Sequence, residues 1–193
     1  MIQQLLSYFK SNALQELNRI SFIALIMISL VALGFQVFQH ELPCPLCLLE
    51  RMGILAMGLG ALGIVIDGIK TRYYGMSLLA TMMTALCAGR QVLLHIVPGS
   101  GGYGSTILSL HMYSWTLIFC CVYLVYLSFA LCVPTQFKDQ LNGNGSKPYK
   151  SQLNWVLIIL YCSVIVLNIM SVLSICGFGA CPDNPVAYFM WLH

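Results

Sequence analysis

The sequence has 193 residues, of which 59% are hydrophobic and only 8% are charged. Soluble domains average about 25% charged residues, so this chain has too few charges to cover a water-facing surface. An integral membrane protein is therefore expected, with the lipid bilayer as its surroundings. The net charge of +3 is small, and no basic cluster is long enough to indicate a nucleic-acid partner.

Residues 1–19 precede the first long apolar run. Apolar side chains recur at helical spacing between Ile2 and Leu17, which is the pattern of an amphipathic helix at a membrane surface. We expect this segment to lie on the cytoplasmic side.

Five apolar runs are each about long enough to cross a bilayer, which takes about 20 helical residues. They cover residues 20–38, 48–66, 74–97, 113–133 and 155–175. The alternation typical of strands is absent, so an all-α membrane fold is predicted. We expect residues 20–133 to form a four-helix bundle, residues 134–154 a cytoplasmic linker, residues 155–175 a fifth transmembrane helix, and residues 176–193 a tail.

The basic residues predict the orientation. Seven of the nine fall in three segments separated by two spans each, namely Lys10, Arg19, Lys70, Arg72, Lys138, Lys147 and Lys150. Such residues are enriched on the cytoplasmic side of membranes, so the N-terminus is expected in the cytoplasm and the C-terminus on the opposite side. The other two, Arg51 and Arg90, fall near the opposite face.

The nine cysteines divide by position. Cys44 and Cys47 form a CxxC at the non-cytoplasmic start of the second span, and Cys176 and Cys181 follow the fifth span on the same side. CxxC is the spacing of redox-active dithiols. For the second pair, both a structural bridge and thiol exchange stay open, because the intervening glycines let so short a loop close. The other five cysteines are expected to be small apolar packing groups.

Thiol–disulfide exchange needs a thiolate, which we expect at Cys47. This residue should lie in the first turn of a helix, where the helix dipole favours negative charge, with Arg51 one turn further on the same face. Two other interpretations of Arg51 are snorkelling to lipid headgroups and pairing with Glu50 or Glu41.

A membrane-embedded dithiol also needs an electron acceptor. The chain has no dinucleotide-binding or haem-attachment motif, so a quinone that enters between helices is the predicted cofactor. Its developing negative oxygen would need a cation or hydrogen-bond donors. The candidates at that depth are Arg51, Arg90, His95 and His111; for each histidine the alternative is an ordinary interfacial residue.

The stretch FQHELPCPLCLLER resembles the first extracytoplasmic segment of the disulfide bond formation protein B (DsbB) family, and Arg90 to Trp115 also resembles its members. The resemblance covers roughly residues 19–133. It implies that a quinone, either ubiquinone or menaquinone, generates the CxxC disulfide, with Cys47 contacting the quinone and Arg51 stabilising the complex. It further implies a bacterial inner membrane, a periplasmic active site, and a soluble periplasmic DsbA-like oxidase as electron donor.

The chain departs from that family in one respect. The loop between the third and fourth spans, residues 96–110, contains no cysteine, although the family's second redox pair lies there. Our hypothesis is that Cys176 and Cys181 replace that pair and pass electrons to the CxxC. The aromatic residues Tyr188, Phe189 and Trp191 in the tail are expected to anchor it at the interface.

Three other classes of protein share some of these sequence features. A helical bundle that reduces quinone for its own sake, as in the vitamin K epoxide reductase-like family, is disfavoured because its CxxC lies in a later span. A four-cysteine zinc site fits the spacing, but an oxidising compartment argues against it. The third is a non-catalytic structural membrane protein, which would not respond to loss of Cys44 or Cys47.

Overall fold

The computed structural model describes residues 2–39, 42–97, 102, 104, 106–133, 137, 152–179, 181 and 188, with the backbone only for residues 2–12. Its elements in chain order are α1 (Ile2–Phe38), α2 (Pro45–Asp67), α3 (Thr71–Leu94), β1 (Thr106–Ile107), β2 (Leu110–His111), α4 (Met112–Leu131) and α6 (Gln152–Cys176). Within these residues five helices are long and apolar enough to cross a membrane. The predicted all-α fold with five spans is confirmed, and each helix overlaps its predicted run.

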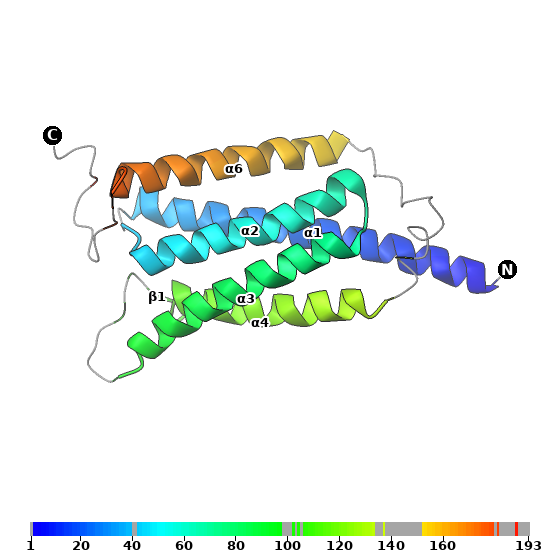
Figure 1. Cartoon of the computed structure of the whole chain (residues 1–193), viewed down its shortest axis with the longest axis horizontal. Helices are drawn as coiled ribbons and strands as arrows, with labels where there is room; N and C mark the ends of the chain where they lie inside the picture. Colours follow the sequence, from blue (N-terminus) through cyan, green and yellow to red (C-terminus); the bar gives the residue numbers. More distant parts are fainter. Residues whose placement is uncertain are drawn as a thin grey trace.

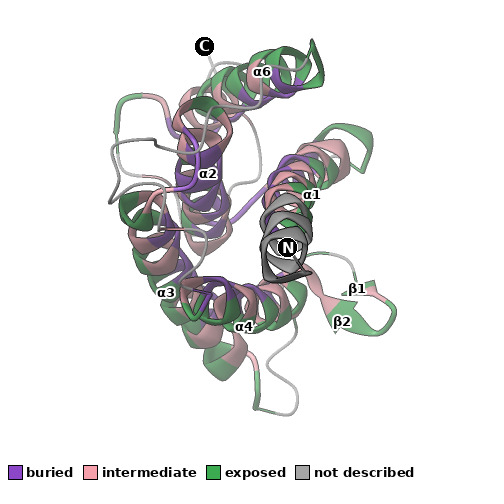
Figure 2. Ribbon diagram, turned by 90° about the vertical axis from the view of Figure 1, so that its right-hand side faces the viewer, coloured by how far each residue is buried: buried purple, intermediate pink, exposed green. Residues whose placement is uncertain are grey.

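The helices run antiparallel along one long axis (Figure 1), with the start of α1 and the end of α6 at opposite ends. Viewed along that axis (Figure 2), α2 lies between α3 and α6, and α1 packs beside both α2 and α6. The end of the bundle that carries Cys44 and Cys176 is called the cysteine end below. Because the helices alternate in direction, both cysteine pairs meet there.

The first helix is longer than the sequence analysis expected. α1 has 37 residues, about 55 Å at 1.5 Å per residue, which exceeds a hydrocarbon core of about 30 Å. The expected boundary at residue 19 therefore falls inside a continuous helix, and the N-terminal segment projects beyond the bundle (Figure 1). No Pro or Gly interrupts the chain near residue 19, so nothing ends the helix there.

Polar side chains inside the bundle form hydrogen bonds with side chains of neighbouring helices. Asn18 of α1 is buried, and its Oδ1 accepts hydrogen bonds from the hydroxyls of Tyr74 (2.9 Å) and Tyr126 (2.5 Å). Hydrocarbon offers no alternative partner, so such bonds tie transmembrane helices together. This junction joins α1, α3 and α4 far from the cysteine end.

The fifth span is an integral part of the bundle. The buried Tyr161 of α6 packs edge-on against Phe22 and donates a hydrogen bond to the Leu55 carbonyl of α2. Gly58 makes room for this ring, because a Cβ at that position would lie 2.6 Å from the Tyr161 ring. The helix therefore docks on both α1 and α2.

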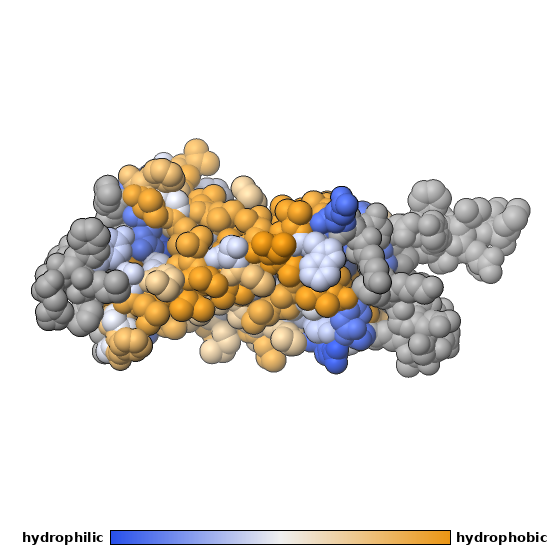
Figure 3. Space-filling view, turned by 90° about the horizontal axis from the view of Figure 1, so that it is seen from above, coloured by the Kyte–Doolittle hydropathy of each residue, from blue (hydrophilic) through white to orange (hydrophobic). Residues whose placement is uncertain are grey.

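The surface fits a membrane environment. In Figure 3 a continuous apolar band occupies the middle of the visible face, with hydrophilic residues gathered toward the ends. At the end opposite the cysteines, Asp67 accepts from Lys70 (2.5 Å), Arg72 (2.6 Å) and the Tyr73 hydroxyl (2.6 Å). These charged groups mark that end as a polar boundary of the spanning region.

One element departs from the predicted all-helical pattern. Thr106 pairs with His111 and Ile107 with Leu110 in a two-stranded antiparallel hairpin. Its turn residues Leu108 and Ser109 have φ of 51° and 68°, the left-handed conformation that two-residue hairpins favour. The Trp115 indole donates to the Ile107 carbonyl at 3.0 Å, which holds the hairpin against the start of α4.

Candidate active site

The CxxC begins α2. Pro45 occupies the first turn, where the lost N–H costs nothing, and Cys44 is the N-cap with extended backbone. The Cys44 sulfur accepts a hydrogen bond from the Cys47 backbone N–H at 3.2 Å, as a capping side chain does. The predicted place of Cys47, in the first turn of the second span, is confirmed.

The side chain of Gln91 contacts both sulfurs. This α3 residue is 1% exposed, and its Nε2 lies 3.5 Å from Cys44 Sγ and 3.3 Å from Cys47 Sγ. A buried amide that donates to two sulfurs stabilises negative charge on either of them. The sequence analysis missed Gln91, although it is adjacent to Arg90 in the stretch that carried the resemblance.

The sulfur with the lowered pKa is that of Cys44, whereas the sequence predicts the thiolate at Cys47. Both cysteines are free thiols, and the pKa of Cys44 is lowered to about 7, mainly by the hydrogen bond from the Cys47 thiol. Hydrogen bonds from the Cys47 backbone and from Gln91 lower this pKa further, while burial opposes them. The sequence analysis expected the thiolate at Cys47. In the reduced protein it is the pKa of Cys44 that the hydrogen bond from Cys47 lowers, and the thiolate at Cys47 against the quinone stays a prediction.

The guanidinium of Arg51 is held by α1. Its NH1 donates to Gln36 Oε1 at 2.6 Å and its NH2 donates to the Ala32 carbonyl at 2.8 Å. Within the described part of the chain no ion pair joins it to Glu50. Both hydrogen bonds of the guanidinium run to α1. Arg51 therefore neither snorkels to the lipid headgroups nor pairs with Glu50.

A cavity of about 80 Å³ opens between α1, α2 and α4 at the cysteine end. A single water needs about 10–15 Å³ on the same measure, so the cavity holds several waters or one small ring. Its polar lining includes Cys47, Glu50, Arg51, Thr116 and Tyr113. Its apolar lining includes Ile28, Phe35, Ile54 and Met112. Cys47 and Arg51 therefore face one space, as their spacing of one helical turn predicted.

Glu50 is the least satisfied group in this cavity. It is 4% exposed, and its Oε1 has no hydrogen-bond partner among the described residues. Burying a polar atom without a partner costs free energy, and such exceptions in folded proteins concentrate where a group has a chemical role. The sequence analysis had considered Glu50 only as a partner for Arg51.

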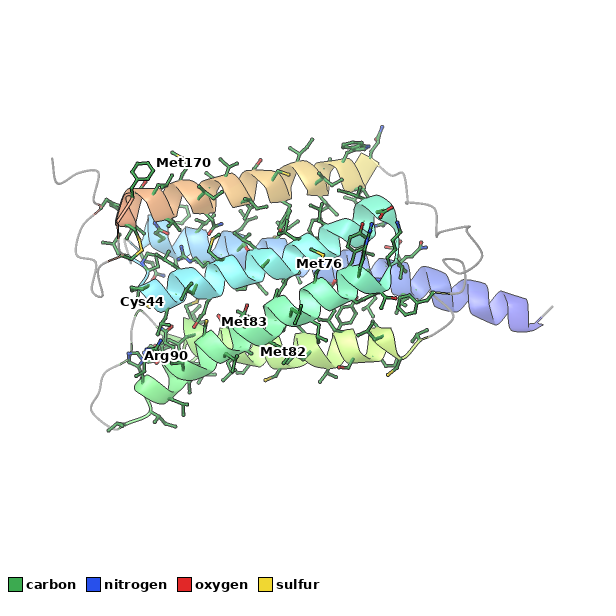
Figure 4. The ribbon with its side chains drawn as sticks, in the orientation of Figure 1. Cys44, Met76, Met82, Met83, Arg90 and Met170 are labelled. Carbon is green, nitrogen blue, oxygen red and sulfur yellow. A yellow bond between two sulfur atoms is a disulfide. The ribbon has the colours of Figure 1, made fainter. Side chains whose placement is uncertain are left out.

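The other predicted cofactor-binding residues lie close to the cavity without lining it. The rings of His95 and His111 stack on the Tyr113 ring at 5.4 and 5.2 Å between centroids, and Tyr113 lines the cavity. Arg90 is exposed at the cysteine end of α3 (Figure 4) and is not among the described lining residues. Their roles in binding stay predictions.

The tail pair forms a disulfide. Cys176 ends α6, and its sulfur is bonded to Cys181, with 4.5 Å between their Cα atoms. Leu48, the residue after Cys47, packs in one buried cluster with Ile175 and Cys176, and Cys181 lies against it. Pro45 and Cys181 also line a shared apolar groove between α2 and α6. The fifth helix thus brings the second pair beside the CxxC segment.

The tail's aromatic residues are only partly described. Tyr188 lies against the cluster of Leu48 and Cys176, whereas Phe189 and Trp191 are outside the described residues. Most of the predicted linker, residues 134–154, is also outside them.

The four cysteines do not form a metal site in the described part of the chain. Two of the four thiols are consumed by the Cys176–Cys181 disulfide, and no group of three or more His, Cys, Asp or Glu residues there is placed to hold a metal ion. The geometry therefore gives the four-cysteine zinc alternative no support.

These features define a class: a multi-pass membrane protein with a dithiol at a helix N-terminus and a disulfide beside it. Residues 15–103 match the family model described as disulfide bond formation protein DsbB. The disulfide bond formation protein B of Acinetobacter baumannii is similar to the chain, with 27% identity over 159 residues, 72% of this chain and 84% of the relative. No solved structure gives a significant match. The chain is therefore similar to the DsbB family over the segment from α1 to the loop after α3, and α6 lies outside the matched segment.

Proposed function

We propose that this protein oxidises the dithiol of a soluble thioredoxin-like partner and passes the electrons to a membrane quinone. The similarity of residues 15–103 to the DsbB family supports a role in disulfide bond formation. The observation that carries the rest is that Cys47 and Arg51 line one cavity within the membrane-spanning bundle, beside a second cysteine pair.

The residues around the cavity suit a quinone. Its two carbonyl oxygens need donors, and Arg51 and Tyr113, which both carry hydrogen-bond donors, line the space. Apolar side chains from α1 and α2 would accept the ring, and Glu50 has an oxygen without a partner. When bound, the quinone supplies the two-electron acceptor.

The chain's own residues would act in two exchanges. The partner's dithiol reduces the Cys176–Cys181 disulfide and becomes a disulfide; the tail dithiol then reduces the Cys44–Cys47 disulfide and is re-formed as a disulfide. The CxxC dithiol finally loses two electrons and two protons as its S–S bond forms again, and the quinone becomes the quinol. Cys47 faces the cavity, whereas the buried Cys44 has the lowered pKa.

We place the protein in a bacterial inner membrane with the cysteine end in the periplasm. The distribution of basic residues supports this, because Lys70 and Arg72 lie where α2 ends and α3 begins, at the end opposite the cysteines, and Arg19 lies in the half of α1 remote from Cys44. A DsbA-like oxidase is the proposed partner, and disulfides persist in that compartment.

Purified protein tests the proposal. Quinone reduction is followed with a reduced thioredoxin-like partner and, separately, with dithiothreitol, for wild type and for the double variant Cys176→Ser, Cys181→Ser. We expect the double variant to lose turnover with the partner but to keep it with dithiothreitol. The matched control is Cys121→Ser, Cys162→Ser, which removes two exposed cysteines within spans and should change neither rate.

Other outcomes would contradict parts of the proposal. Persistence of both activities in the tail double variant would mean that the CxxC accepts electrons directly and that the tail disulfide is structural. If wild type reduces no quinone with either donor, the oxidase function is wrong.

A further inference from the structure

The fifth helix does more than carry the tail cysteines. At the cysteine end it approaches Gln36 of α1, a residue that is only 4% exposed. Gln36 is also the residue that accepts the hydrogen bond from Arg51. One buried amide thus joins α1, α2 and α6 at the edge of the cavity that Gln36 itself helps to line.

Three contacts fix this amide. Gln36 Oε1 accepts from Arg51 NH1 at 2.6 Å and from the Ser171 hydroxyl at 2.8 Å. Its Nε2 lies 3.5 Å from the Tyr188 hydroxyl oxygen, at the outer limit of a hydrogen bond. A flipped amide would point its NH₂ at the guanidinium, and neither group could accept. The orientation of the amide is therefore determined by its neighbours.

Ser171 behaves differently from the other serines of α6. Ser163 and Ser174 each donate to the carbonyl four residues earlier in their own helix, at 2.9 and 2.8 Å. That local bond is available to any helical serine, and it satisfies the hydroxyl inside a membrane. The Ser171 hydroxyl instead reaches across to another helix, so it restrains Gln36 rather than its own backbone.

We propose that Ser171 is a positioning residue of the quinone site: it holds the Gln36 amide so that Gln36 holds the Arg51 guanidinium at the cavity. This inference rests on the proposed function. It makes α6, which lies outside the family-model match, a structural part of the site as well as the carrier of the tail disulfide.

The expected size of the effect follows from the bond. Without the Ser171 hydroxyl, Gln36 can still accept from Arg51, but its amide oxygen loses the one hydrogen bond that ties it to α6. A net hydrogen bond contributes about 0.5–1.5 kcal/mol, which corresponds to about 2- to 13-fold in an equilibrium constant. We therefore expect Ser171→Ala to weaken quinone binding by about 3- to 10-fold.

The experiment measures binding rather than turnover. The dissociation constant of a short-chain benzoquinone is determined by fluorescence quenching of the full-length protein in nanodiscs, for wild type, Ser171→Ala, Ser171→Thr and Ser163→Ala. Ser171→Thr keeps the hydroxyl and should restore wild-type affinity. Ser163→Ala removes a hydroxyl from the same helix that bonds only to its own backbone, and it should leave affinity unchanged.

A double-variant cycle separates positioning from general damage. In a Gln36→Leu background the Ser171 hydroxyl has lost its acceptor, so Ser171→Ala should have no further effect on affinity. An equal loss in both backgrounds would overturn the inference, as would an unchanged affinity for Ser171→Ala in the wild-type background. Wild type that neither binds nor reduces quinone would instead overturn the proposed function itself.

Discussion

Gln91 places its side-chain nitrogen 3.3 Å from the Cys47 sulfur, inside a protein whose surroundings are otherwise hydrocarbon. The same nitrogen lies 3.5 Å from Cys44 Sγ. An amide N–H that serves two sulfurs stabilises a negative charge that moves between them, and it does so without adding a charge of its own. The dithiol therefore depends on α3 as well as on its own helix.

We expect Gln91→Leu to make Cys44 less acidic. Loss of the donor should raise its pKa by about one unit, equivalent to about 1.4 kcal/mol. At pH 7 the thiolate fraction would fall from about one half to about one tenth, so alkylation by iodoacetamide would slow about fivefold. Quantitative mass spectrometry of the Cys44 peptide measures this rate. Gln152→Leu, at an exposed position at the start of α6, is the control and should have no effect.

The pH dependence of Cys44 in wild type gives a second test. Because the pKa is lowered from 9.0 to about 7, alkylation of the reduced protein should rise through about pH 7 and level off above pH 8. A pKa lowered by folding stabilises the folded state fully above pH 9, and this contribution is lost as the pH falls through 7. An alkylation midpoint near 9 would show that the hydrogen bond from Cys47 is absent in solution.

Glu50→Gln should separate stability from activity. The carboxyl is buried with one oxygen unpartnered, so a neutral amide should leave the thermal midpoint unchanged or raise it. We expect quinone reduction to fall at least tenfold, because the amide cannot carry a proton released from Cys47, and acid–base groups typically contribute about 10²–10⁴-fold.

The control for Glu50 is Glu16→Gln, which changes an exposed carboxylate paired with Arg19 at 3.0 Å on the far part of α1. Surface ion pairs contribute little, so both its thermal midpoint and its turnover should match wild type. Full activity in Glu50→Gln would remove Glu50 from the reaction.

The docking of α6 can be tested without any activity assay. A Cβ at Gly58 would lie 2.6 Å from the buried Tyr161 ring, which is held by its bond to the Leu55 carbonyl. We expect Gly58→Ala to destabilise the protein by about 1–3 kcal/mol, as overpacking does. Gly75→Ala is the matched control, because nothing lies within 4 Å of its Cβ position. Equal unfolding midpoints for the two variants would contradict this packing.

Several features could be read from the sequence because they depend on neighbouring residues alone. The five spans follow from sums of hydropathy over about 20 residues. The CxxC at a helix start follows from Pro45, and the position of Cys44 and Cys176 at the same end of the bundle follows from the number of spans between them. Arg51 and Cys47 share a face because they are one helical turn apart.

Other features were decided by tertiary structure. The lowered pKa of Cys44 depends first on the hydrogen bond from the Cys47 thiol, and then on the capping bond from the Cys47 backbone and on Gln91 of α3. The hydrogen bonds that Arg51 and Ser171 donate to Gln36 join residues that are 15 and 135 positions apart. Such contacts depend on how each helix is rotated about its axis and how far it is shifted along its neighbour. Hydropathy says only that a helix is in the membrane, whereas rotation and shift are fixed by side-chain packing between helices distant in sequence.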